Sequence, residues 1–191
     1  MLVCITGKSG CGKTTAIQYI KKNGFNTWMA DEYIHQIYKK NKIGYLEIKK
    51  AFGKEYVNLK EVDRKKLGSL VFTNSKYLKK LNNITLPLIK NKIIELKNKD
   101  QLIFCELAIY INHEKYFKKY FKKIILISAS KKLEKNNLEK KFGSLRKFPT
   151  KRVGNLKNPI KSSTIKYDFF VDNSKNKKNF YSEIKKIVDK F

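Results

Sequence analysis

Apolar residues occur along the chain in short continuous runs, which alternate with longer stretches where apolar positions recur at helical spacing. Continuous apolar runs are typical of parallel strands buried on both faces of a sheet. The clearest helical stretch closes the chain, where Phe180, Ile184 and Ile187 fall on one face. This alternation predicts a three-layer α/β fold around a five-stranded parallel sheet. The predicted strands are residues 2–6, 27–30, 102–106, 124–128 and 169–172.

Two connections between predicted strands are longer than a crossover helix requires. Residues 31–101, mostly helical in pattern, are interpreted as an inserted helical subdomain with its body at about 40–99. Within it, residues 75–99 predict one long helix interrupted near Pro87, because an interior proline removes a helical hydrogen bond. The charged connection after the fourth strand, residues 131–166, predicts a helical lid at about 131–160. We expect residues 1–191 to form a single domain.

The loop after the first predicted strand carries the most informative motif. Residues 7–14 read GKSGCGKT and match G-x-x-x-x-G-K-[ST], with a predicted helix at 14–22 following. Glycines let backbone N–H groups approach phosphate oxygens, Lys13 can bridge the β- and γ-phosphates, and Thr14 can bind Mg²⁺. The alternative is a glycine-rich turn without a ligand. The motif predicts a P-loop nucleotide site in which ATP phosphates contact Gly7, Ser9, Gly10, Cys11, Gly12, Lys13, Thr14 and Thr15.

Two acidic residues stand at the ends of predicted strands, on the edge of a parallel sheet where ligands bind. Asp31 can orient the attacking hydroxyl of a substrate, or it can cap a helix at 32–40. Glu106 suggests a Walker B acid that holds Mg²⁺ through water, the alternative being a surface acid. His35, one helical turn after Asp31, is a candidate contact for a substrate phosphate, with a structural role as its alternative.

The formal net charge of +28, from 44 basic and 16 acidic residues, would by itself suggest a polyanionic partner. Only three of the 44 basic residues are arginines, and lysines occur in every segment. We therefore interpret the charge as background composition and expect no specific nucleic-acid partner. Arginine binds phosphate bidentately, as lysine cannot. Arg64 in the insert and Arg146 and Arg152 in the lid are thus candidate phosphate contacts, unless they were retained by chance.

Composition excludes several other classes of protein. No apolar run approaches the roughly 20 residues of a membrane span, and the apolar N-terminus is too short for a signal peptide. The three cysteines, Cys4, Cys11 and Cys105, form no CxxC pair, which argues against both a disulfide framework and a zinc site. We expect a cytoplasmic protein with no membrane partner, a monomer rather than an oligomer.

Over nearly its whole length the sequence resembles the dephospho-coenzyme A kinase family, P-loop small-molecule kinases related to nucleoside monophosphate kinases. The matches, in order, are the phosphate loop at 5–15, Asp31, AFG at 51–53, DRKKLGSLVF at 63–72 and VDNS at 171–174. The resemblance implies transfer of a phosphate from ATP, with Mg²⁺, to the ribose 3′-hydroxyl of dephospho-coenzyme A. It implies catalytic roles for Lys13, Asp31 and Arg152, substrate contacts for Asp31, His35, Arg64 and Glu106, and lid contacts for Lys141, Arg146 and Arg152.

The sequence also departs from the family pattern at several positions. Met29, Leu86, Glu106 and Tyr110 replace an acid, a histidine, a proline and a glutamate, and Asn137 and Lys141 stand where the family has two lid arginines. A nucleoside or nucleoside-monophosphate kinase is an alternative, against which the 63–72 stretch argues. A second alternative is a non-catalytic nucleotide-dependent RNA-binding protein, but no RNA-binding motif supports it.

Overall fold

The structure is a computed structural model that describes residues 1–142 and 165–191, with side chains described for 1–140 and 165–191. The chain divides into two compact units. In described residues, the first unit comprises 1–30, 93–142 and 165–191, and the second comprises Asp31–Lys92. Each unit has a core of its own.

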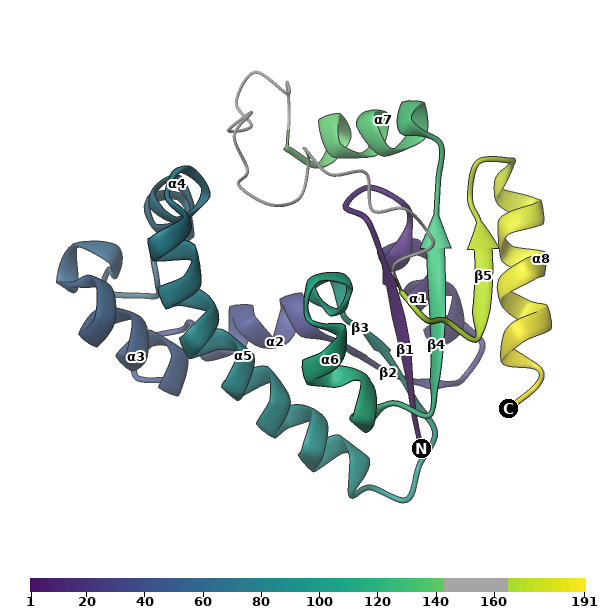
Figure 1. Cartoon of the computed structure of the whole chain (residues 1–191), viewed down its shortest axis with the longest axis horizontal. Coiled ribbons are helices and arrows are strands. Elements are labelled where there is room, and N and C mark those ends of the chain that lie inside the picture. Colours follow the sequence, from purple (N-terminus) through teal and green to yellow (C-terminus); the bar gives the residue numbers. More distant parts are fainter. Residues whose placement is uncertain (143–164) are drawn as a thin grey trace. The chain divides into compact units, whose positions relative to one another are not determined.

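The first unit is built on a sheet of five parallel strands in the order β2-β3-β1-β4-β5 (Figure 1). The predicted α/β fold is therefore confirmed, and every strand boundary lies within one residue of its predicted position. The strands are β1 (Leu2–Gly7), β2 (Asn26–Met29), β3 (Ile103–Glu106), β4 (Lys123–Ser128) and β5 (Phe169–Asp172). The unit's helices are α1 (Lys13–Lys22), η2 (Ala108–Asn112), α6 (Glu114–Phe117), η3 (Lys118–Tyr120), α7 (Lys131–Phe142) and α8 (Lys177–Val188).

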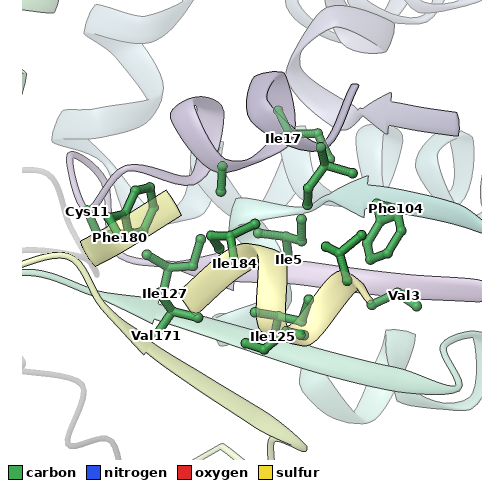
Figure 2. Close-up of a cluster of buried hydrophobic side chains, with 14 residues drawn as sticks. Val3, Ile5, Cys11, Ile17, Phe104, Ile125, Ile127, Val171, Phe180 and Ile184 are labelled. Atoms are coloured by element: carbon green, nitrogen blue, oxygen red, sulfur yellow. The ribbon is translucent and has the colours of Figure 1, made fainter. Parts of the chain in front are cut away.

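Helices α1 and α8 pack on one face of the sheet (Figure 2). Ile5 of β1 lies in one buried cluster with Ile17 of α1 and Ile184 of α8. The preceding residue of β1, Cys4, is equally buried but points to the opposite face, because side chains alternate along a strand. The sheet is thus covered on both faces, which explains why its three inner strands, β3, β1 and β4, read as nearly continuous apolar runs.

The second unit is helical. Its core includes Ile48, Leu67 and Val71, which are nearly inaccessible to solvent. Asp63 caps α4, because its carboxylate accepts hydrogen bonds from the backbone N–H groups of Lys65 and Lys66 at 3.1 and 3.0 Å. The elements are α2 (Ala30–Ile37), α3 (Ile43–Phe52), η1 (Lys54–Tyr56), α4 (Arg64–Thr73) and α5 (Ser75–Lys97), the last of which continues into the first unit.

The predicted interruption near Pro87 is wrong, because α5 continues through this residue. An interior proline costs roughly 3 kcal/mol in a helix. Here the helix keeps its course because Ile84 and Leu88 pack against the core of the second unit, and Ile89 is buried. Tertiary packing outweighs local propensity in this segment. Neither α5 nor any other helix in the described part of the chain is long and apolar enough to cross a membrane.

Candidate active site

The phosphate-loop motif lies between the end of β1 and the start of α1, as predicted. Gly10 and Gly12 have φ angles of 84° and 107°, a left-handed conformation that suits glycine. Gly12 is the N-cap residue of α1, and among the described residues no side chain caps this helix. The first N–H groups of α1 therefore have the arrangement that favours an anion at a helix N-terminus.

Lys13 is held inside this loop. Only 7% of the residue is exposed, and its Nζ donates a hydrogen bond to the backbone carbonyl of Lys8 at 2.8 Å. The amide of Cys11 donates to the same carbonyl at 3.3 Å. The ammonium group is thus placed within the turn that the motif assigns to phosphate.

Thr14 and Glu106 approach each other from α1 and β3. The Thr14 hydroxyl lies 3.4 Å from both Oε1 and Oε2 of Glu106. Glu106 is only 6% exposed, so the alternative of a surface acid at a strand end is wrong. Glu106 belongs to β3, which pairs with β1 so that Glu106 lies opposite Ile5. A hydroxyl beside a carboxylate fits Mg²⁺, which prefers oxygen ligands and is often held by one or two carboxylates together with substrate phosphates.

Asp31 belongs to the second unit, two residues after the end of β2. The alternative that it caps a helix at 32–40 is wrong in its geometry, because α2 begins at Ala30 and Asp31 is the second residue of its first turn. A negative charge there is still favourable to the helix dipole. The side chain is exposed, so it remains accessible to a substrate.

The structure brings together two predicted substrate-binding residues of the second unit. Nη1 of Arg64, at the start of α4, is in hydrogen-bonding contact with Nε2 of His35 in α2. Nη2 of Arg64 also lies 3.8 Å from Oε1 of Glu61. Because both partners of this ion pair are exposed, we expect it to contribute little to stability. The guanidinium plane is thus oriented by an imidazole and a carboxylate on an exposed surface.

The lid contacts remain predictions. Arg146 and Arg152 lie outside the described residues, as does the side chain of Lys141. Helix α7, which follows β4 directly, occupies the first part of the predicted lid.

Sequence reasoning missed three residues that surround the phosphate loop. Asn137 of α7 donates a hydrogen bond to the carbonyl of Gly10 at 2.8 Å, and Asn173 after β5 donates to the carbonyl of Cys11 at 2.9 Å. Burial raises the pKa of the Glu134 carboxyl in α7, although the charges of Lys8 and Lys13 oppose that rise. The available signal was weak, since Asn137 stood out only as a departure from a family arginine and Asn173 only as part of the VDNS match at 171–174.

Cys11 contributes its backbone to the loop and its side chain to the core. The thiol lies in the buried cluster with Ile17 and Phe180 (Figure 2). Burial raises the pKa of this thiol, with a smaller opposing effect of Lys13. The side chain therefore stays protonated and apolar in character, so the predicted phosphate contact of Cys11 can come only from its backbone.

A five-stranded parallel sheet with a phosphate loop after its central strand defines a P-loop nucleotide-binding protein. Comparison with solved structures finds the same fold in other proteins. A protein from Thermus thermophilus superposes with a TM-score of 0.79 at 21% identity, over 100% of this chain and 96% of that one. A shikimate kinase from Acinetobacter baumannii has a TM-score of 0.52 at 12% identity, over 98% and 90%. Both similarities concern the fold alone.

Sequence comparison is more specific. The family model described as dephospho-CoA kinase matches residues 1–147. The dephospho-CoA kinase of Mycoplasma genitalium is 38% identical over 83% of this chain and 84% of its own length. That of Aquifex aeolicus is 31% identical over 97% and 94%. The solved dephospho-CoA kinase of Campylobacter jejuni is 26% identical, over 99% of this chain and 96% of its own, with a TM-score of 0.68.

The chain belongs to the dephospho-CoA kinase family. It is accordingly an ATP-using phosphotransferase of coenzyme A biosynthesis, and the function expected from the sequence is confirmed at this level.

Proposed function

We propose that this chain transfers the γ-phosphoryl group of ATP to the ribose 3′-hydroxyl of dephospho-CoA, giving coenzyme A and ADP. The observation that carries the proposal is the family match over residues 1–147, because this range contains both the phosphate loop and the 63–72 stretch. The enclosed Lys13 and the Thr14–Glu106 pair support the same reaction, since both suit a nucleotide with its metal ion.

On the nucleotide side, the backbone N–H groups at the start of α1 and the Lys13 ammonium would bind the β- and γ-phosphates. Thr14 would hold Mg²⁺ directly and Glu106 would hold it through water. When bound, this ion neutralises charge on the transferring phosphate. The low exposure of Lys13 and Glu106 supports these roles, because electrostatic interactions are stronger where water is excluded.

On the acceptor side, the Asp31 carboxylate would take the proton of the ribose 3′-hydroxyl. The hydroxyl oxygen then bonds to the γ-phosphorus while the bond from that phosphorus to the β–γ bridging oxygen breaks, and ADP leaves. The oriented guanidinium of Arg64, with His35, would bind a phosphate of dephospho-CoA. The exposure of all three side chains supports contact with a substrate.

Other expectations stay predictions. Lys141, Arg146 and Arg152 would add positive charge around the transferring phosphate, with Arg152 in a catalytic role. We also expect a monomer with a cytoplasmic location and no specific nucleic-acid partner.

The test compares several possible phosphate acceptors. The purified protein is incubated with ATP and Mg²⁺ and with dephospho-CoA, nucleoside monophosphates or nucleosides, and ADP release is measured. We expect ADP release that depends on dephospho-CoA, and coenzyme A as the second product. Equal or greater release with a nucleoside monophosphate would favour that class of kinase. RNA binding with a steep salt dependence and no transfer to any acceptor would favour the non-catalytic alternative.

A further inference from the structure

Two asparagine side chains hold consecutive carbonyl groups of the phosphate loop from outside. Asn137 comes from α7 and contacts the Gly10 oxygen at 2.8 Å. Asn173 comes from the turn after β5 and contacts the Cys11 oxygen at 2.9 Å. Neither residue belongs to the phosphate-loop motif, and each is more than 120 positions away from its partner in sequence.

These contacts fix the orientation of two peptide groups. A trans peptide is planar, with its carbonyl and its N–H on opposite edges. Anchoring the Gly10 carbonyl outward therefore turns the Cys11 N–H inward, and anchoring the Cys11 carbonyl does the same for the Gly12 N–H. The Cys11 N–H does point into the loop, where it donates to the Lys8 carbonyl at 3.3 Å. The Lys8 carbonyl also accepts a hydrogen bond from Nζ of Lys13. The inward side of the loop is therefore the side on which the Lys13 ammonium group lies.

Both anchoring elements approach the loop closely at a glycine. A Cβ atom on Gly10 would lie 2.5 Å from the Glu134 carbonyl oxygen of α7. A Cβ atom on Gly12 would lie 2.4 Å from Nδ2 of Asn173. Gly12 is a defined position of the motif, but Gly10 is a variable one. The approach of α7 thus gives a reason for glycine at position 10 that the motif does not.

We propose that Asn137 and Asn173 are positioning residues for ATP, which hold the phosphate loop in its phosphate-binding conformation before the nucleotide binds. Each side-chain amide donates to a carbonyl of the loop, so it acts by orienting backbone N–H groups. Pre-orientation lowers the cost of ordering the loop on binding and appears as tighter binding of ATP. The proposal rests on ATP being the phosphate donor.

The test compares neutral substitutions of similar size that remove only the amide. Asn137→Leu is paired with Asn136→Leu, an exposed neighbour on the same helix. Asn173→Leu is paired with Asn179→Leu, exposed in the first turn of α8. The dissociation constant of MgATP is measured by calorimetric titration of the full chain, and KM is measured separately for ATP and dephospho-CoA. The melting temperature without nucleotide is recorded for each variant.

We expect Asn137→Leu and Asn173→Leu each to weaken MgATP binding by about 5- to 30-fold, the range that corresponds to the loss of one partly buried hydrogen bond. The KM for ATP should rise in parallel, while the KM for dephospho-CoA and MgATP binding by the two controls stay within about twofold of wild type. A lower melting temperature with unchanged MgATP affinity would overturn the proposal and leave the asparagines structural. If the wild-type chain itself failed to bind MgATP, the proposed function would fail first, and the two failures are thus distinguishable.

Discussion

The two units hold their candidate residues in opposite ways. In the first unit Lys13 and Glu106 are 7% and 6% exposed, and each has a hydrogen-bond partner within the unit. In the second unit Asp31 and His35 are exposed, and the partners of Arg64 are themselves near the surface. The nucleotide residues are therefore built into a core, and the acceptor residues are displayed on a helical surface.

This difference indicates which substitutions should affect which substrate. A change in the enclosed loop alters several backbone positions together, because the loop is packed against α7 and the turn after β5. A change on the exposed surface of the second unit removes a contact while leaving its core in place. We expect variants of the first unit to change ATP binding and variants of the second to change acceptor use alone.

The largest effect is expected from Lys13→Ala. Removal of the ammonium takes away the charge that stabilises the transferring phosphate, and turnover should fall by about 10³-fold. The matched control is Lys22→Ala, an exposed lysine in the last turn of the same helix. Turnover is followed by ADP release, and circular dichroism verifies that the fold persists. A variant that kept more than a tenth of wild-type turnover would refute the role of Lys13.

Asp31→Asn tests the exposed surface. Loss of a proton acceptor should lower kcat by about 10²-fold while the KM for ATP stays unchanged. Glu32→Gln, one residue further in the same first turn, removes an equal charge from the helix N-terminus and should be nearly silent. Single-turnover formation of coenzyme A measures the chemical step. If both variants behaved alike, Asp31 would act only on the helix dipole.

Gly10→Ala tests the enclosed loop. The substitution forces a Cβ against the Glu134 carbonyl at a φ of 84°, and we expect MgATP affinity to fall by about 10- to 30-fold. Gly24→Ala separates the two causes, because Gly24 has a similar φ of 87° but nothing within 4 Å of the added atom. It should leave MgATP binding unchanged. Equal losses in both variants would trace the effect to backbone strain rather than to the contact with α7.

Sequence alone predicted the sheet closely because its three inner strands, β3, β1 and β4, are buried on both faces and so are nearly continuously apolar. It placed the phosphate loop for a related reason, since the left-handed backbone at Gly12, a defined position of the motif, restricts residue type. It placed Glu106 at the end of a strand but left its burial open. Burial depends on the register of β3 between β1 and β2, which no local pattern reveals.

Errors arose where tertiary contacts decide the outcome. The course of α5 through Pro87 depends on Ile84 and Leu88 packing against residues distant in sequence. The roles of Asn137 and Asn173 could not be predicted for a similar reason, because a single hydrogen bond from a side-chain amide produces no repeating pattern in the sequence. The contact between His35 and Arg64 joins α2 and α4, which are separated in sequence by α3 and η1. The sequence identified each of the two residues as a candidate but not their contact.

The smallest effect is expected from Arg64→Lys, which keeps the charge but removes the planar donor array. Lysine cannot reproduce bidentate binding of phosphate, so the KM for dephospho-CoA should rise by about fivefold with the KM for ATP unchanged. Lys65→Arg, the next residue of α4, is the reverse exchange at an exposed site and should change neither KM. Initial rates are measured with each substrate varied at saturating levels of the other. A rise in the KM for ATP of the same size would contradict the division between the two units, because an exposed residue of the helical unit would then act on nucleotide binding.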